Sequence, residues 1–120
     1  LMFMTSRNNR ISTGSEFPKI IDKARAYLQE SVESDINMPD VAAYLNMSYT
    51  TFRHAFKKYT GLSPAQYFIN LKLHRAKEML RGTTASVKEI SYILHFESPE
   101  YFATAFRKKT GMSPSEFRKA

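Results

Sequence analysis

The chain has 120 residues, of which 42% are hydrophobic and 24% are charged, and its formal net charge is +7. This length allows one compact domain, or two very small units that share a core. The chain contains no cysteine, which excludes disulfides and cysteine-ligated metals, and no stretch approaches the ~20 apolar residues that cross a bilayer.

A polar segment lies near the start of the chain. Residues 4–16 are rich in Ser, Thr, Asn and Gly, so we interpret 1–16 as a linker or arm from a missing upstream domain. From Phe17 onward, apolar residues recur at helical spacing and predict a helix over about 17–33. A short second helix follows, and the side chain of Asn37 is expected to cap it.

Serines and glycines mark the next two helices. Ser48 is a suitable N-cap for a third helix, which Gly61 is expected to end. Ser63, followed by proline, then opens a long linking helix over 64–81. Gly82 is interpreted as the residue that ends this helix.

The same pattern returns about fifty residues later. Ser86 and Glu89 have the spacing of a capping box and predict a short helix over 87–94. Ser98 is expected to begin the helix that follows, and Ser113 to begin a last one. No strand pattern competes with these helices, so the predicted fold class is all-α.

Nearly the same nine residues occur twice, as FKKYTGLSP at 56–64 and as FRKKTGMSP at 106–114. A repeat of this length indicates one supersecondary unit that is used twice. In each copy, the predicted elements are a short helix, a tight turn and a second helix, over 38–59 and over 86–109. These elements predict two helix-turn-helix units joined by the long central helix.

The turn inside each unit supports this interpretation. Such a turn often needs one residue at positive φ, and Asn and His tolerate that conformation better than most non-glycine residues. Asn46 and His95 occupy the two turn positions. The helix after the first turn presents Thr50, Arg53 and other polar side chains on its outer face, which suits a DNA major groove.

Positive charge is concentrated in the repeated part of the chain. Residues 1–47 contain five Lys or Arg and six Asp or Glu, for a net charge of −1. Residues 48–120 contain thirteen and five, for a net charge of +8, and the two parts give the total of +7. A solvated basic surface would explain this excess, but a face that binds a polyanion would carry the same charge.

Two motifs make the sequence similar to a known family. The first is V-A-x-x-L-x-M-S-x-x-x-F-R-x-x-F-K at 41–57, followed by G-x-S-P at 61–64. The second is I-S-x-x-L-x-F-E-S-x-x-Y-F-x-x-x-F-R-K-x-x-G-M-S-P-S-E-F-R at 90–118. Over about 17–118 the sequence resembles the AraC/XylS-type transcription regulators. The resemblance implies a DNA-binding domain over 17–120, within a sequence-specific transcription regulator.

The resemblance also implies partners and a location. The partners are double-stranded DNA and RNA polymerase. The family usually places a ligand-sensing, dimerising or phosphoreceiver domain upstream, which implies a homodimer formed through that domain. A regulator of this type is expected in the cytoplasm.

The family's contact positions can be carried over residue by residue. Six residues take base-facing positions: Thr50, Arg53 and His54 in the first unit, and Glu100, Ala103 and Thr104 in the second. An arginine such as Arg53 can donate two hydrogen bonds to guanine, the commonest specific contact. Seven residues are expected to contact phosphates, five through cationic side chains and two through helix N-termini: Lys57, Lys58, Arg107, Lys108, Lys109, Ser48 and Ser98.

Other classes of function were weighed against DNA binding. The three histidines, His54, His74 and His95, lie far apart with no carboxylate at ligand spacing, so no metal site is expected. No nucleophile–base pair and no glycine-rich phosphate loop occurs, so neither an enzyme nor a cofactor is expected. Arg75 on the long helix is interpreted as solvated. One alternative is a basic helical adaptor that binds an acidic protein; another is a module appended to an enzyme.

Overall fold

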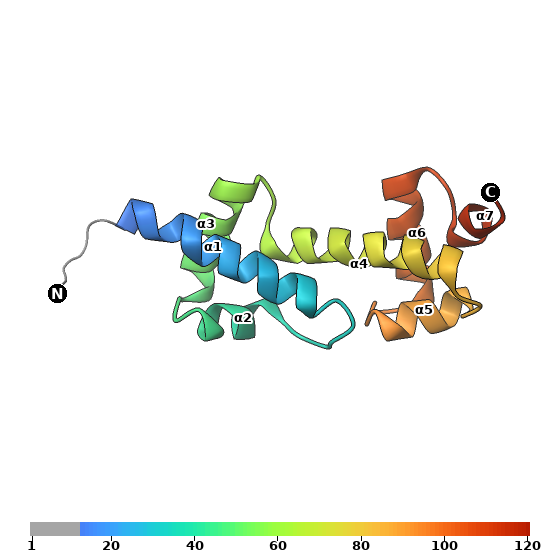
Figure 1. The fold of residues 1–120 in the computed structure, drawn as a ribbon, viewed down its shortest axis with the longest axis horizontal. Helices are drawn as coiled ribbons and strands as arrows, with labels where there is room; N and C mark the ends of the chain where they lie inside the picture. The colour runs from blue at the N-terminus through green and yellow to red at the C-terminus, as the bar shows by residue number, and fades with distance from the viewer. Residues whose placement is uncertain (1–12) are drawn as a thin grey trace.

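The computed structural model describes residues 13–120, which form seven α-helices and no strand. The all-α prediction is therefore confirmed. The molecule is elongated, with extents of 57 × 22 × 22 Å, and α4 (Pro64–Gly82) runs along its long axis (Figure 1). The other helices are α1 (Thr13–Glu30), α2 (Met38–Tyr44), α3 (Tyr49–Thr60), α5 (Val87–Ile93), α6 (Pro99–Thr110) and α7 (Pro114–Lys119).

Helix α1 differs from its prediction at both ends. Residues 13–16, assigned to the linker, form its first turn, and residues 1–12 lie outside the described range. The prediction rested on apolar spacing, which starts only at Phe17. The helix ends at Glu30 rather than near residue 33: the Ser31 N–H donates to the Leu28 carbonyl oxygen at 3.1 Å, and the Ser31 hydroxyl group donates to the Tyr27 carbonyl oxygen at 2.7 Å. Such a bond competes with continuation of the helical ladder.

Side-chain caps fix where most of the other helices start. The Asn37 side chain accepts from the Asp40 N–H at 2.9 Å, as predicted. The hydroxyl groups of the four serines at positions 48, 63, 98 and 113 each accept from an N–H in the first turn of the following helix. Ser86 and Glu89 form the predicted capping box, with the Ser86 N–H donating to the Glu89 carboxylate at 2.7 Å.

The turn of each helix-turn-helix unit contains one residue in the left-handed conformation. Asn46 has φ 58° and His95 has φ 55°, as the sequence predicted. In the second turn, the His95 N–H donates to the Tyr92 carbonyl oxygen and the Phe96 N–H to the Ser91 carbonyl oxygen. This is the pair of bonds of a Schellman motif, which ends α5 and turns the chain toward α6.

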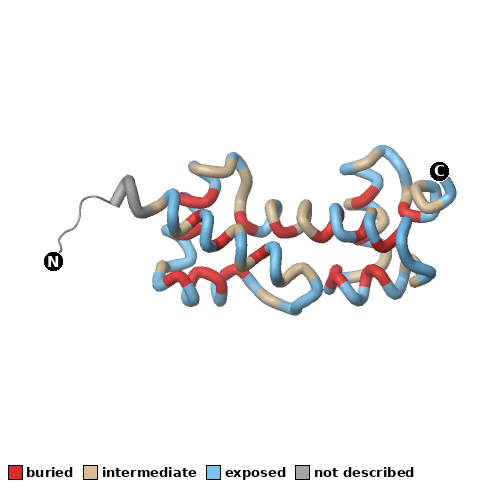
Figure 2. The backbone as a smooth tube through the Cα atoms, in the orientation of Figure 1, coloured by how far each residue is buried: buried red, intermediate tan, exposed pale blue. Residues whose placement is uncertain are grey.

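The two units have equivalent but separate hydrophobic cores, which follow each other along α4 (Figure 2). In the first core, the Phe52 and Phe56 rings lie 5.6 Å apart at 66°. In the second, the Phe102 and Phe106 rings lie 5.8 Å apart at 65°. The repeated sequence is therefore a repeated packing arrangement, and α4 contributes Phe68 to the first core and later residues to the second.

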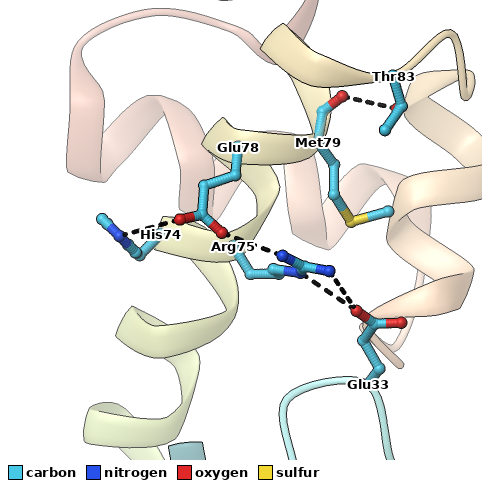
Figure 3. Close-up of polar contacts among 6 residues, drawn as sticks. All are labelled: Glu33, His74, Arg75, Glu78, Met79 and Thr83. Carbon is cyan, nitrogen blue, oxygen red and sulfur yellow. Dashed lines mark hydrogen bonds and ion pairs between the residues drawn. The ribbon is translucent and has the colours of Figure 1, made fainter.

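The end of α4 corrects the interpretation of Gly82. The described glycines at positive φ are Gly61 and Gly111, whereas Gly82 is the last residue of the helix itself. The helix stops because Thr83 has extended backbone angles, φ −133° and ψ 169°. Its hydroxyl group donates to the Met79 carbonyl oxygen at 2.7 Å (Figure 3).

Arg75 is ion-paired rather than only solvated. Its guanidinium lies 2.9 Å from the Glu33 carboxylate, on the loop between α1 and α2, and 3.2 Å from that of Glu78 (Figure 3). His74 lies 3.7 Å from the other Glu78 oxygen. Exposed pairs of this kind contribute little stability individually, but the Glu33 contact joins the loop between α1 and α2 to the middle of α4.

Candidate nucleic-acid interface

Helix α3 separates its buried face from the face predicted to contact bases. Phe52, Ala55 and Phe56 are buried in the first core. Thr50, Arg53 and His54 are all exposed, on the remaining face of the same helix. Of the predicted phosphate contacts in this unit, Ser48 caps the helix and is exposed, and Lys57 and Lys58 are exposed in its last turn.

An aromatic ring supports Arg53. The guanidinium carbon lies 6.0 Å from the centroid of the Tyr49 ring, one helical turn earlier. Tyr49 is itself 37% exposed, so the pair is at the surface. A ring beside the guanidinium restricts the directions in which the long side chain can point. The sequence analysis did not include Tyr49, although its spacing of four residues from Arg53 is the expected signal.

His54 lies at the border between α3 and α1. It lines a shallow hollow with Phe17 from α1 and with Thr51 and Lys58 from α3. Thr51 also accepts a hydrogen bond from the Ser48 hydroxyl group at 2.9 Å. The side of α3 that carries His54 therefore lies next to the start of α1.

Helix α6 presents its predicted contact residues less uniformly. Glu100 and Thr104 are exposed, whereas Ala103 is only partly exposed. Ser98 caps the helix, and Pro99 at its first position has no N–H to donate. The carboxylate of Glu100 lies in the first turn, where a phosphate would otherwise bind the helix N-terminus.

The cations of α6 lie in its last turn. Arg107, Lys108 and Lys109 are all exposed. Arg107 is 3.9 Å from the carboxylate of Glu116 on α7, which weakens its availability to a phosphate. Lys108 and Lys109 have no carboxylate within ion-pair distance among the described residues.

A groove between α6 and the start of α4 adds residues that the sequence analysis missed. It is lined by Thr104, Lys108 and Lys109 and also by Tyr101, one turn before Thr104. From α4 it is lined by the apolar Ile69 and Leu73 and by the polar Gln66 and Asn70, with the Gln66 amide donating to the Asn70 side chain at 3.0 Å. The packing of α4 against α6 joins residues far apart in the sequence, so helical spacing could not predict that Gln66 and Asn70 line this groove.

The second helices of the two units, α3 and α6, lie toward opposite ends of the long axis of the molecule (Figure 1). Helices α3 and α6 both have 12 residues, and both rise from the lower to the upper edge of the view, on either side of the centre of α4 (Figure 1). No helix in 13–120 is long and apolar enough to cross a membrane. Within the same residues, no group of three His, Cys, Asp or Glu is placed to hold a metal ion.

Comparison with known proteins assigns this arrangement to a family. Residues 41–120 match a family model described as a helix-turn-helix domain. The HTH-type transcriptional regulator GbdR of Pseudomonas aeruginosa is 30% identical over 105 residues, 88% of this chain and 28% of GbdR. A Chromobacterium violaceum regulator with an AraC-type DNA-binding domain superposes with a TM-score of 0.79 at 27% identity, covering 89% of this chain and 94% of that one. The chain belongs to the AraC/XylS family.

A second structure of the family contains DNA. The DNA-binding domain of the transcriptional factor AdpA, solved in complex with a target DNA, superposes with a TM-score of 0.78 at 28% identity. The match covers 82% of this chain and 89% of the AdpA domain. The pairs α2–α3 and α5–α6 are thus the two helix-turn-helix units of an AraC-type DNA-binding domain.

Proposed function

We propose that this domain binds duplex DNA in a sequence-specific manner and reads two successive major grooves with α3 and α6. The observation that carries the proposal is the pair of exposed polar helix faces held at opposite ends of α4. The 19 residues of α4 span about 28 Å at 1.5 Å per residue. One turn of B-DNA is about 34 Å, so one chain can reach two grooves if the DNA bends slightly toward it.

In this proposal, the first unit supplies most of the base contacts. Arg53, directed by the Tyr49 ring, donates to a guanine, while Thr50 and His54 contact neighbouring base edges. The second unit contributes Thr104, the partly exposed Ala103 and Glu100. Ala103 offers only a methyl group, and a glutamate can accept from cytosine but is repelled by phosphates.

The remaining contacts fix the domain on the DNA backbone. Lys57, Lys58, Lys108 and Lys109 are exposed cations at the ends of the two reading helices, and Arg107 joins them when it leaves Glu116. The helix start at Ser48 offers backbone N–H groups to a phosphate, whereas at Ser98 the same contact is weaker, since Pro99 has no N–H and Glu100 opposes an anion. These contacts do not distinguish between base pairs. They fix the position of the domain along the DNA and make its affinity depend strongly on salt concentration.

We further propose that the domain is part of a transcription regulator in the cytoplasm, which works with RNA polymerase by binding and not by catalysis. The names of its relatives support this role, since GbdR is a transcriptional regulator. This chain matches 28% of the length of GbdR, which leaves room for an upstream domain through which a homodimer would form.

Selection of bound DNA from a random pool tests the proposal. An enriched site that spans about two helical turns, with two separate conserved blocks, is the expected result. The competing function is a basic adaptor for an acidic protein. Such an adaptor would enrich no sequence, and its affinity for DNA would be the same for every member of the pool.

A further inference from the structure

Lys72 is a cation buried in the middle of the long helix. It is 8% exposed, and it and Ser91 are the buried polar residues among those described. Burial of an ammonium group costs free energy unless the group is hydrogen-bonded or paired. Burial lowers the pKa of Lys72, and the nearby carboxylate of Asp35 partly offsets this effect. A lysine in this position therefore needs a structural reason.

The contacts of Lys72 come from both units. Its Nζ lies 4.6 Å from the ring centroid of Phe68, which belongs to the first core, and 5.5 Å from that of Phe96, which belongs to the second. Asp35 lies on the loop between α1 and α2, which leads into the first unit. The ammonium group is thus at the boundary where the two cores meet.

The hydrogen bond of Lys72 reaches the turn that starts the second reading helix. Nζ donates to the carbonyl oxygen of His95 at 3.3 Å. His95 is the left-handed residue of the Schellman turn, and Ser98, the N-cap of α6, follows three residues later. Arg75, one helical turn after Lys72, contacts Glu33 on the loop that leads into the first unit. One turn of α4 therefore carries one polar contact to the loop before α2 and one to the turn before α6.

We propose that Lys72 is a positioning residue, which fixes the second helix-turn-helix unit relative to the first and so sets the half-site spacing that the domain accepts. The half-site consequence rests on the proposed two-groove binding, whereas the effect on relative orientation does not need DNA. Without the ammonium group, the His95 carbonyl loses its partner and α4 loses its polar contact to the turn before α6.

Spin-label distances test the orientation directly. The chain has no cysteine, so Ala43→Cys on α2 and Lys88→Cys on α5 place one label on an exposed position of each unit. We expect a narrow distance distribution in the parent chain and in Lys77→Met, which removes a cation from the same helix. Lys72→Met should broaden or shift it. If the spin-label distance distribution has the same width and the same mean in the parent chain and in both variants, the proposal is overturned, whatever the result of the DNA selection.

A DNA measurement then tests the spacing. The selected site is compared with versions in which one or two base pairs are inserted between its blocks. The Lys72→Met variant should bind the site of parent spacing about tenfold more weakly than the parent chain does, and should lose less affinity for the sites with inserted base pairs. Its affinity should therefore depend less on spacing. An equal loss of affinity at every spacing would mean that Lys72 contributes only positive charge to DNA binding, and would contradict the proposal. If Lys72→Met does not fold by circular dichroism, Lys72→Gln replaces it in both measurements.

Discussion

Arg118 donates a hydrogen bond from Nε to the carbonyl oxygen of Leu80, at 3.0 Å and across 38 residues of sequence. A second bond runs from its Nη2 to the Thr83 carbonyl oxygen at 3.2 Å. The carbonyl groups in the last turn of a helix have no partner within the helix. Arg118 on α7 thus caps the end of α4. A second contact joins the two helices, since the Arg81 guanidinium of α4 lies 4.4 Å from the ring centroid of Phe117 on α7.

Arg118→Met should therefore destabilise the chain by about 1–3 kcal/mol, the usual cost of leaving a partly buried carbonyl without its charged donor. Lys119→Met is the matched control, since Lys119 is exposed and also in the last turn of α7. Urea unfolding followed by circular dichroism measures both. If the two variants unfold at the same midpoint, Arg118 does not hold α7 on α4.

Two glycines with equally open surroundings should respond to alanine in opposite directions. A Cβ added at Gly82 or at Gly111 would meet no atom within 4 Å, so neither substitution creates a clash. Gly111 has φ +85°, where a side chain costs about 1–2 kcal/mol. Gly82 is in the last turn of a helix, where alanine restricts the unfolded chain and stabilises by about 0.4–1 kcal/mol. Thermal unfolding of Gly82→Ala and Gly111→Ala should shift in opposite directions; a loss in both would contradict the assignment.

Local signals explain why most of the fold could be predicted from the sequence. Capping serines, Gly61 and the turn residues Asn46 and His95 each act through bonds to residues a few positions away. Gly82 was expected to cap the linking helix, but it is the last helical residue and Thr83 is the C-cap, so the end lies one residue later than predicted. The Arg75–Glu33 pair joins residues 42 apart, and no local pattern indicates it.

The candidate site was predictable to the extent that helical spacing determines exposure. Spacing placed Arg53 and Thr104 on outer faces, and both are exposed. It gave no information on contacts between helices. The Arg107–Glu116 ion pair and the groove formed by α4 and α6 both depend on packing of separate elements. Whether the predicted residues contact DNA stays a prediction.

The capping boxes should make stability depend on acid pH. The Ser86 N–H donates to the carboxylate of Glu89 and lowers the pKa of that group below its ordinary value of 4.5. The Ser113 N–H lowers the pKa of Glu116 in the same way. A lowered folded pKa means that the stabilisation is complete above the unfolded value of about 4.5 and is lost as pH falls through the folded one. Glu89→Gln with Glu116→Gln keeps an acceptor at each site but removes the titration.

The double variant should therefore be less stable than the parent chain at pH 7 and lose less stability on acidification, so that the two converge below about pH 4.5. Thermal unfolding at pH 7, 5, 4 and 3 measures the difference. Glu30→Gln with Glu97→Gln is a control at exposed carboxylates outside the capping boxes. Parallel pH curves for the parent and the capping-box variant would show that these carboxylates do not couple to folding.

The two helices proposed to contact bases carry different side chains. Helix α3 offers the Arg53 guanidinium, 6.0 Å from the Tyr49 ring centroid, and α6 offers a partly exposed methyl group at Ala103 and a carboxylate at Glu100. Arg53→Ala should then cost about 1–3 kcal/mol in binding and relax the preference at one base pair. Glu100→Ala should change affinity little or raise it, because the carboxylate repels phosphates.

Lys108→Ala separates base reading from backbone anchoring. Lys108 is exposed at the end of α6, so its loss should weaken binding to all sequences alike and reduce the slope of log affinity against log salt by about one. Binding of each variant to a set of single-base changes in the selected site measures both effects. The asymmetry requires mismatches in the first half-site to cost more than those in the second. Equal costs in the two half-sites would mean that α6 reads bases as strongly as α3.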